Sequence, residues 1–204
     1  MRGSVKEARL SLADRCLRGF AYCMVHLVQR PQLHGSKPAL DAPAIFVCRH
    51  VGLMDPVILM VQYYHQMIHP LAARDYVEKN CFTKAFFAHA QCFPIDRVNY
   101  DDQWLRDSTR ALAKGESIII YPEGRRNKEG DGLLPFHTGA VRLAVESGAQ
   151  LIPVFNGRWS FPHRYHLAIG SPFHVDPIPE GGVTRDWLHA QAAKMQQKVE
   201  ELRF

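Results

Sequence analysis

The stretch AIFVCRHVGLMDP, residues 44–56, predicts where a buried strand ends and a helix begins. Its first five residues are apolar and include β-branched side chains, which is typical of a strand inside a sheet. Pro56 favours a helix start, because the first turn of a helix does not use the amide hydrogen that proline lacks. His50 and Asp55 lie between the strand and the helix. The sequence therefore places a base and a carboxylate at the carboxyl end of a strand.

Strands and helices alternate along the rest of the chain. Apolar runs predict further strands at residues 92–95, 117–121, 150–155 and 165–170. Helical spacing of apolar residues predicts helices at residues 56–67, 78–90, 101–114, 134–148 and 188–202. This alternation predicts an α/β fold, a single layered domain with a mixed, largely parallel sheet flanked by helices.

The composition is that of a folded chain with a modest basic excess. Of 204 residues, 47% are hydrophobic and 22% are charged, which excludes a disordered protein and fits one domain. A formal charge of +5 can attract nucleic acid, anionic lipid or a phosphorylated small molecule. The basic residues are dispersed and form no motif that reads RNA or DNA, so we expect no nucleic-acid partner.

The five cysteines form no C-x-x-C pair and stand mostly beside apolar residues. They predict buried, reduced thiols in a cytoplasmic protein. The apolar stretch near the start follows several arginines and has no small-residue cleavage site, so it does not predict a signal peptide. Residues 56–73 lack formal charge, but polar side chains and a proline interrupt them, and we expect no membrane-spanning helix.

Residues 5–30 predict an amphipathic helix at the N-terminus. Apolar residues recur there at spacings of three and four, and the basic residues lie largely off that stripe. The helix either packs on its own domain or lies on anionic lipid with its arginines facing the headgroups. We expect residues 1–36 to form this helix and a linker, which can contact a membrane surface, and residues 37–204 to form the main domain.

His50 and Asp55 have two interpretations. A histidine at the end of a strand can act as a general base, while the aspartate fixes the imidazole tautomer and stabilises the imidazolium ion. Alternatively, Asp55 is an N-cap before a proline at the first helical position, and His50 is an ordinary member of a set of eleven histidines. This stretch alone leaves both interpretations open.

Two further stretches place charged residues after apolar runs. In CFPIDR, residues 92–97, Arg97 offers a planar fork to a phosphate or carboxylate, or forms a surface ion pair with the aspartate before it. In IIIYPEGRR, residues 118–126, a strand runs into a turn that can expose backbone amides and the Glu123 carboxylate, or that is an ordinary turn. Open α/β sheets bind ligands beyond the carboxyl ends of their strands, so we expect this loop and the His50 loop to face one cleft.

Taken together, these blocks resemble the glycerolipid acyltransferase family, typified by 1-acylglycerol-3-phosphate acyltransferase. HVGLMD is similar to the family's H-x-x-x-x-D block, FPIDR to its second block, YPEGRRN to its F-P-E-G-T-R-S block and LIPVF to its fourth. FHTGAVRLA resembles the helix start that lies between the last two blocks. The blocks occur in order over residues 50–154, about half of the chain.

The chain departs from the family pattern inside these blocks. Arg125 replaces the usual threonine, Asn127 replaces serine and His137 replaces a common lysine. Gln91 and Pro94 stand where the second block often has glycine and phenylalanine. None of these changes touches the expected base. Arg125 adds positive charge beside the expected phosphate site and can signal a different acceptor headgroup.

The resemblance implies transfer of a fatty acyl group from a thioester of coenzyme A or acyl carrier protein to the hydroxyl of a lysophospholipid, most simply 1-acylglycerol-3-phosphate, in phospholipid biosynthesis. His50 is then the base and Asp55 holds it, while backbone amides near His50 or Gly52 stabilise the oxyanion. No metal and no bound cofactor is implied. An apolar groove for the acyl chain is implied near residues 57–68 or 82–90. The residues implied at the acceptor phosphate and headgroup are Arg97, Glu123, Gly124, Arg125 and Arg126.

Two other functions compete with this interpretation. A hydrolase of phosphate or thioester substrates can use His50, Asp55 and Glu123 around a metal ion or a water molecule, and it releases product without an acceptor. A non-catalytic module can bind anionic lipid or acyl carrier protein through the basic surface.

The acyltransferase interpretation assigns the activity to residues 37–204 and implies a cytoplasmic protein held peripherally on the inner face of a membrane.

Overall fold

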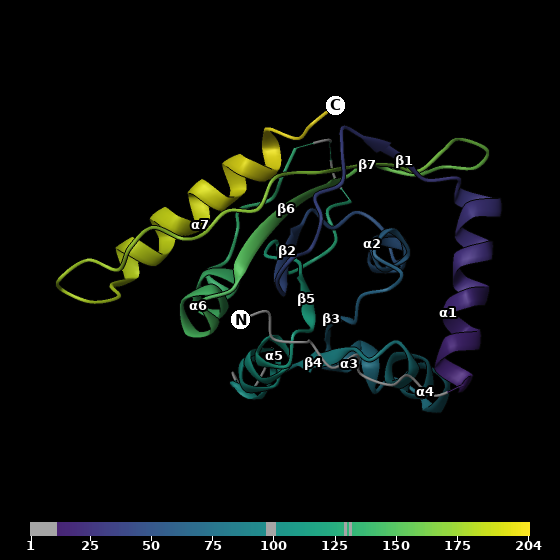
Figure 1. Ribbon diagram of the computed structural model, residues 1–204, viewed down its shortest axis with the longest axis horizontal. Coiled ribbons are helices and arrows are strands. Elements are labelled where there is room, and N and C mark those ends of the chain that lie inside the picture. The colour runs from purple at the N-terminus through teal and green to yellow at the C-terminus, as the bar shows by residue number, and fades with distance from the viewer. Residues whose placement is uncertain (1–11, 97–100, 129, 131) are drawn as a thin grey trace.

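The computed structural model describes residues 12–96, 101–128, 130 and 132–204 of the chain (Figure 1). Its strands form one sheet in the order β1-β7-β6-β2-β5-β3-β4. Every described pair of neighbours is parallel except β6 and β7, which are antiparallel. The expected α/β fold with a mixed, largely parallel sheet is therefore confirmed. The strands are β1 Gln32–His34, β2 Ala44–Cys48, β3 Ile68–Ala73, β4 Phe93–Ile95, β5 Ser117–Ile120, β6 Gln150–Asn156 and β7 His166–Ile169.

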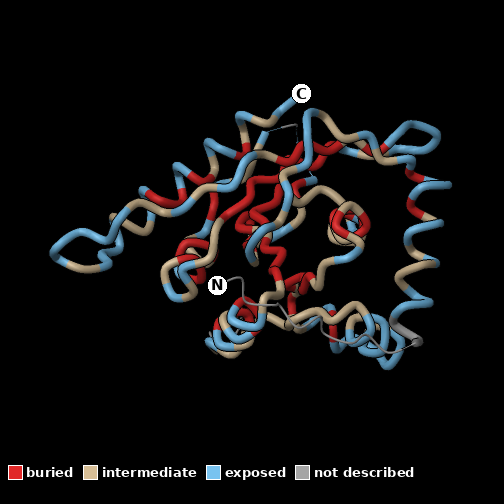
Figure 2. The backbone as a smooth tube through the Cα atoms, viewed as in Figure 1, coloured by how far each residue is buried: buried red, intermediate tan, exposed pale blue. Residues whose placement is uncertain are grey.

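Helices cover both faces of the sheet and complete two hydrophobic cores. Along β2, Ile45 and Val47 pack with residues of α5, α6 and α7, whereas Phe46 and Cys48 pack with residues of α2 and η1. This division follows from the pleat of a strand, in which successive side chains point to opposite faces. Figure 2 shows the buried residues gathered along the central strands. The helices are α1 Leu12–Met24, the π-helical η1 Val25–Gln29, α2 Asp55–Gln62, α3 Arg74–Val77, α4 Cys81–His89, α5 Gln103–Ala113, α6 Gly139–Ser147 and α7 Arg185–Glu200.

Strand β3 was not predicted from the sequence. His69 and Pro70 interrupt its apolar pattern, and the residues before it continue the helical spacing of α2. In the structure α2 ends at Gln62, and β3 pairs with β5 on one side and β4 on the other. The buried His69 ring is hydrogen-bonded to the Gln91 carbonyl and the Glu116 carboxylate, each at 2.9 Å. Pairing with two neighbouring strands and these two hydrogen bonds therefore outweigh the helical pattern.

Two predicted helices begin later than expected. The helix predicted from residue 78 begins at Cys81 as α4, because Asn80 and Thr83 form a capping box. The Thr83 amide donates to the Asn80 side chain at 2.8 Å, and the Asn80 amide donates to the Thr83 hydroxyl at 3.0 Å. The helix predicted from residue 134 begins at Gly139 as α6.

The predicted N-terminal helix is present from α1 through η1, and residues 1–11 lie outside the described residues. Val25 and Gln29 are buried, and Arg18 donates from Nη2 to the Gln66 carbonyl at 2.8 Å, so this helix packs on its own domain. No helix in the described part of the chain is long and apolar enough to cross a membrane. The same helix leaves four apolar side chains exposed, namely Leu17, Phe20, Leu27 and Val28.

The linker predicted at the end of residues 1–36 is corrected by the structure at three positions. Residues 32–34 form β1, which pairs in parallel with β7 at the edge of the sheet. Strand pairing satisfies backbone groups that a free linker would leave to water. The division of the chain between residues 36 and 37 stays a prediction.

The prediction of buried thiols is wrong for three of the five cysteines. All five are free, but Cys16, Cys23 and Cys81 are exposed because α1 and α4 turn those sides to solvent despite their apolar neighbours. Cys48 is buried in β2, and Cys92 is half-buried. Burial raises the pKa of the Cys48 thiol well above its usual value and that of Cys92 to about 12.

Candidate active site

The loops that follow β2 and β5 meet at the carboxyl edge of the sheet, as expected from parallel strands that pair directly. The amide of His50, after β2, donates to Oε1 of Glu123, after β5, at 2.8 Å. The amide of Asn127 donates to the His50 carbonyl at 2.7 Å. The two loops therefore lie together, and the prediction that they face one cleft stays a prediction.

His50 and Asp55 form a direct pair, with Nδ1 of the ring 3.0 Å from Oδ2 of the carboxylate. An ionised carboxylate only accepts hydrogen bonds, so Nδ1 carries the proton and donates it, which leaves Nε2 as a proton acceptor. The Asp55 side chain is fully buried, whereas the His50 side chain is 18% exposed. The Tyr121 ring stacks on the His50 ring with centroids 4.1 Å apart. This is the geometry of a general base held by a carboxylate.

The alternative role of Asp55 as an N-cap is corrected by the structure. Met54 is the N-cap residue of α2, and Asp55 is the first helical residue. Oδ2 of Asp55 accepts the amides of Val51 at 2.7 Å and Gly52 at 2.9 Å, which lie before the helix. The carboxylate therefore folds the loop back on itself and holds His50 at the same time.

The amides suggested for the oxyanion are already used within the protein. The His50 amide donates to Glu123, and the Val51 and Gly52 amides donate to Asp55. Each of these donors is thus committed to a carboxylate and does not face a substrate. The amides of His50, Val51 and Gly52 are therefore bonded within the protein, and an oxyanion donor elsewhere near His50 or Gly52 stays a prediction.

Glu123 points into the protein and not to solvent, which corrects the expectation of an exposed carboxylate. It is 3% exposed. Besides the His50 amide on Oε1, it accepts the Leu134 amide on Oε2 at 3.0 Å. Hydrogen bonds to a charged acceptor are stronger than those between neutral groups. Glu123 therefore fastens the loop of residues 49–54, which we call the catalytic loop, to the segment that leads into α6.

Gly124 adopts a left-handed conformation with φ of +68°, and an added Cβ would lie 2.9 Å from Cδ2 of His137. Gly148 has nearly the same φ, +67°, with nothing within 4 Å of an added Cβ. We expect Gly124→Ala to lower the free energy of unfolding by about 2–3 kcal/mol, since left-handed strain alone costs about 1–2 kcal/mol and the contact adds to it.

Gly148→Ala is the matched control, because it introduces the same strain without the contact. We expect it to cost about 1 kcal/mol less than Gly124→Ala in urea unfolding. Equal losses in the two variants would show that the His137 ring yields freely and that the turn has no steric need for glycine beyond its φ.

The three predicted arginines are placed differently. Arg125 is exposed. Arg126 donates from Nη2 to the Tyr76 hydroxyl at 3.2 Å, and Tyr76 belongs to α3, which follows β3. Arg97 lies outside the described residues. The structure therefore brings His50, Asp55 and Glu123 together and places Arg126 over the next strand along the same edge of the sheet.

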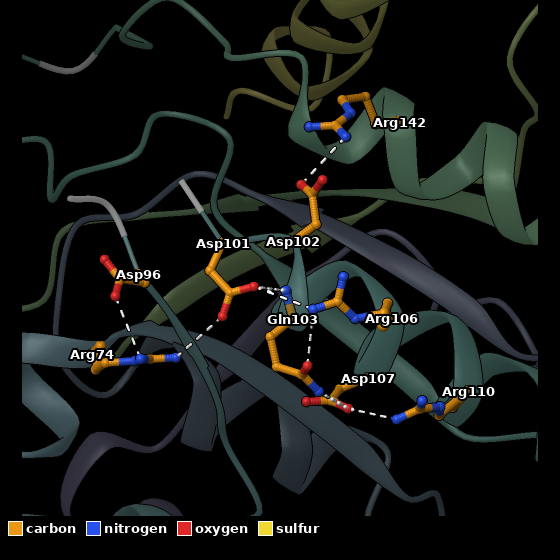
Figure 3. Close-up of polar contacts among 9 residues, drawn as sticks. All are labelled: Arg74, Asp96, Asp101, Asp102, Gln103, Arg106, Asp107, Arg110 and Arg142. Atoms are coloured by element: carbon orange, nitrogen blue, oxygen red, sulfur yellow. Dashed lines mark hydrogen bonds and ion pairs between the residues drawn. The ribbon is translucent and has the colours of Figure 1, made fainter. Parts of the chain in front are cut away.

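Arg74, which was not predicted from the sequence, begins α3 directly after β3. Figure 3 shows its guanidinium between two carboxylates, with Nη1 3.4 Å from Asp96 Oδ2 and Nη2 3.9 Å from Asp101 Oδ2. Asp96 directly follows β4, so Arg74 links the ends of β3 and β4 at the edge that carries His50. In the sequence, Arg74 could have been recognised as a charged residue that follows an apolar strand. Strand β3, however, was not itself predicted.

Arg49 was also missed, although it precedes His50. It is 1% exposed and donates to the Asn156 carbonyl at 3.1 Å and the Gly130 carbonyl at 3.2 Å. Arg158 donates to the same Gly130 carbonyl at 2.7 Å. Two arginines therefore hold the segment after the Pro-Glu-Gly turn against β2 and β6.

A cavity of about 440 Å³ opens beside the catalytic loop. Residues 51–55 and 158–160 line it, together with Gln29 and Tyr165. Within the described ranges, no cluster of three or more histidine, cysteine or acidic side chains is placed to hold a metal ion.

Comparison with known proteins identifies the family. The model of the family described as Acyltransferase matches residues 30–156. A 1-acyl-sn-glycerol-3-phosphate acyltransferase of Bacillus subtilis is 27% identical over 168 residues, which are 79% of this chain and 82% of that protein. The Escherichia coli protein of the same name is 36% identical over 93 residues, 42% of this chain and 38% of that one.

A solved structure shares the fold. The 1-acyl-sn-glycerophosphate (LPA) acyltransferase PlsC of Thermotoga maritima matches with a TM-score of 0.60 and 22% identity, over 95% of this chain and 85% of that one. At this identity the likeness concerns the fold, an α/β domain with the same kind of sheet. The family model, by contrast, covers more than half of the chain. The protein therefore belongs to the acyltransferase family and is a PlsC-like O-acyltransferase.

Proposed function

We propose that this protein transfers a fatty acyl group from an acyl thioester, of coenzyme A or of acyl carrier protein, to the hydroxyl of 1-acylglycerol-3-phosphate in phospholipid biosynthesis. The observation that carries the proposal is the His50 and Asp55 pair, 3.0 Å apart, at the carboxyl edge of the sheet. The acceptor is supported by the relatives named 1-acyl-sn-glycerol-3-phosphate acyltransferase, including those of Bacillus subtilis and Escherichia coli.

In the proposed reaction, Nε2 of His50 takes the proton of the acceptor hydroxyl. Asp55 stabilises the imidazolium ion that forms, because its carboxylate already accepts the proton on Nδ1. The oxygen then attacks the thioester carbonyl, and the tetrahedral intermediate collapses by breaking the carbon–sulfur bond. The imidazolium returns its proton to the leaving thiolate, so the products are the ester and the free thiol.

Arginines beside the Pro-Glu-Gly turn bind the acceptor phosphate in this proposal. Arg125 and Arg126 follow the turn, and Arg97 ends the second block. Guanidinium groups suit this role because their planar fork matches the phosphate oxygens. Glu123 and Gly124 act by shaping the turn, which is consistent with the hydrogen bonds of Glu123 to two backbone amides.

The proposal is tested by transfer of a labelled palmitoyl group to lysophosphatidate in detergent micelles, with the coenzyme A and carrier-protein thioesters in parallel. We expect labelled phosphatidate and one free thiol for each ester formed. Release of free acid at the same rate with and without acceptor would instead support a thioester hydrolase. Transfer to another lysophospholipid but not to lysophosphatidate would overturn the proposed headgroup.

The protein works, in this proposal, on the inner, cytoplasmic face of a membrane. Two helices support contact with lipid. Besides the exposed apolar side of α1 and η1, α4 has no buried residue, and its Phe82 and Phe86 are exposed on one face. Lys79 and Lys84 are also exposed and can meet anionic headgroups. Figure 1 shows α1 and α4 toward one end of the molecule, opposite α7.

We expect the double variant Phe82→Ser with Phe86→Ser to bind anionic lipid vesicles at least about tenfold more weakly, since each buried phenylalanine side chain contributes roughly 1.5–3 kcal/mol. Vesicle co-sedimentation measures the change. The matched control is Ile178→Ser with Val183→Ser, two exposed apolar residues before α7. Equal weakening by both double variants would exclude α4 as the lipid contact.

A further inference from the structure

Asp55 is held by four donors, of which three lie in its own loop. The His50 ring and the amides of Val51 and Gly52 all donate to Oδ2. The other oxygen, Oδ1, accepts the hydroxyl of Tyr165 at 2.9 Å. Tyr165 is 110 positions away in the sequence and lies outside the loop that supplies the other three donors.

The backbone of Tyr165 is fixed on both sides by the N-terminal segment. Its amide donates to the Gln29 carbonyl at 2.8 Å, and its carbonyl accepts the Gln32 amide at 2.7 Å. The residue is 2% exposed and directly precedes β7. Its hydroxyl is therefore presented to Asp55 from a part of the fold independent of the catalytic loop.

Burial, and then the negative charge of Asp55, raise the pKa of Tyr165 well above the usual value for tyrosine and so favour its neutral, donating form. A neutral hydroxyl gives the Asp55 carboxylate a hydrogen-bond donor on Oδ1. A carboxylate held at only one oxygen can turn about its Cβ–Cγ bond and carry the imidazole with it.

We infer that Tyr165 is a positioning residue for the acyl transfer, which orients Asp55 and through it keeps the proton of His50 on Nδ1. The inference rests on the proposed role of His50 as the base. Tyr165 does not touch the reacting atoms in this assignment. It acts by fixing the carboxylate that selects the imidazole tautomer.

The test compares Tyr165→Phe with wild type and with Tyr63→Phe as the matched control. Phenylalanine keeps the ring and its packing but removes the hydroxyl. Tyr63 is also buried, and its hydroxyl donates to the Pro38 carbonyl at 3.2 Å at the far end of α2. Thermal melting of all three proteins establishes that each is folded.

We expect kcat of Tyr165→Phe to fall about tenfold to hundredfold, the range for loss of one hydrogen bond to a charged group. KM for donor and acceptor should stay within about twofold, because the hydroxyl does not contact substrate. Tyr63→Phe should keep the wild-type kcat.

A second measurement does not depend on the substrate. Long-range 1H–15N NMR reports which ring nitrogen of His50 carries the proton. The His50 signals are assigned as those that disappear in His50→Gln. We expect Nδ1–H in wild type and in Tyr63→Phe, and a mixture of tautomers in Tyr165→Phe. An unchanged tautomer together with an unchanged kcat would overturn the inference.

If wild type does not acylate lysophosphatidate, the proposed acceptor fails, and the tautomer comparison alone decides the role of Tyr165.

Discussion

His50→Ala is expected to lower kcat for acyl transfer by about 10²–10⁴, the range that a general base contributes. Its Nε2 is the nitrogen left free to accept a proton, because Nδ1 donates to Asp55 at 3.0 Å. The stability cost should be small, since the ring is partly exposed and stacks on the face of Tyr121. The assay is palmitoyl transfer to lysophosphatidate, and urea unfolding confirms that the variant is folded.

The chain offers a matched control in a second histidine that pairs with a carboxylate. Nε2 of His69 lies 2.9 Å from Oε2 of Glu116, and the ring is buried in β3. His69 pairs with Ile118 in the middle of β5, whereas His50 stacks on Tyr121 beyond its end. We expect His69→Gln to lower the free energy of unfolding and to leave kcat of the folded enzyme near wild type. A large loss of kcat in His69→Gln, or none in His50→Ala, would contradict the assignment.

The part of the site that could be predicted from the sequence follows from the periodicity of strands. The apolar runs of β2 and β5 are short, fully buried and bounded by polar residues, so their ends could be placed. Because neighbouring parallel strands end at one edge, His50 and Glu123 could be expected to lie together. The direction of a side chain in a turn has no such rule. The Glu123 carboxylate was therefore expected at the surface, although it bonds to buried amides.

The residues that were missed depend on contacts between distant segments. Tyr165 reaches Asp55 only because β7 runs antiparallel to β6 and its start is held by the N-terminal segment. Arg74 follows a strand whose pattern His69 and Pro70 obscure. In both cases the local sequence carries no periodic signal for the partner. The fold decides which donor faces which acceptor.

Glu123→Ala is expected to have the largest effect on stability. The substitution leaves the amides of His50 and Leu134 without their acceptor in a site where Glu123 itself is 3% exposed. Each hydrogen bond to a charged group contributes about 1.5–3 kcal/mol, so we expect the free energy of unfolding to fall by about 3–6 kcal/mol. Urea unfolding measures this loss, and Glu146→Ala, an exposed glutamate on α6, should stay within about 0.5 kcal/mol of wild type.

Glu123→Gln separates the role of Glu123 in activity from its role in folding. Glutamine keeps one carbonyl oxygen for one of the two amides, but its NH₂ group must then face the other, which also donates. We expect the variant to lose less stability than Glu123→Ala and to fold, with a lower kcat because the His50 backbone is no longer fixed to the turn after β5. If Glu123 bound the acceptor directly, KM for lysophosphatidate would change while the free energy of unfolding stayed near wild type. A fall in stability with KM unchanged would instead establish that this carboxylate serves the catalytic loop and not the substrate.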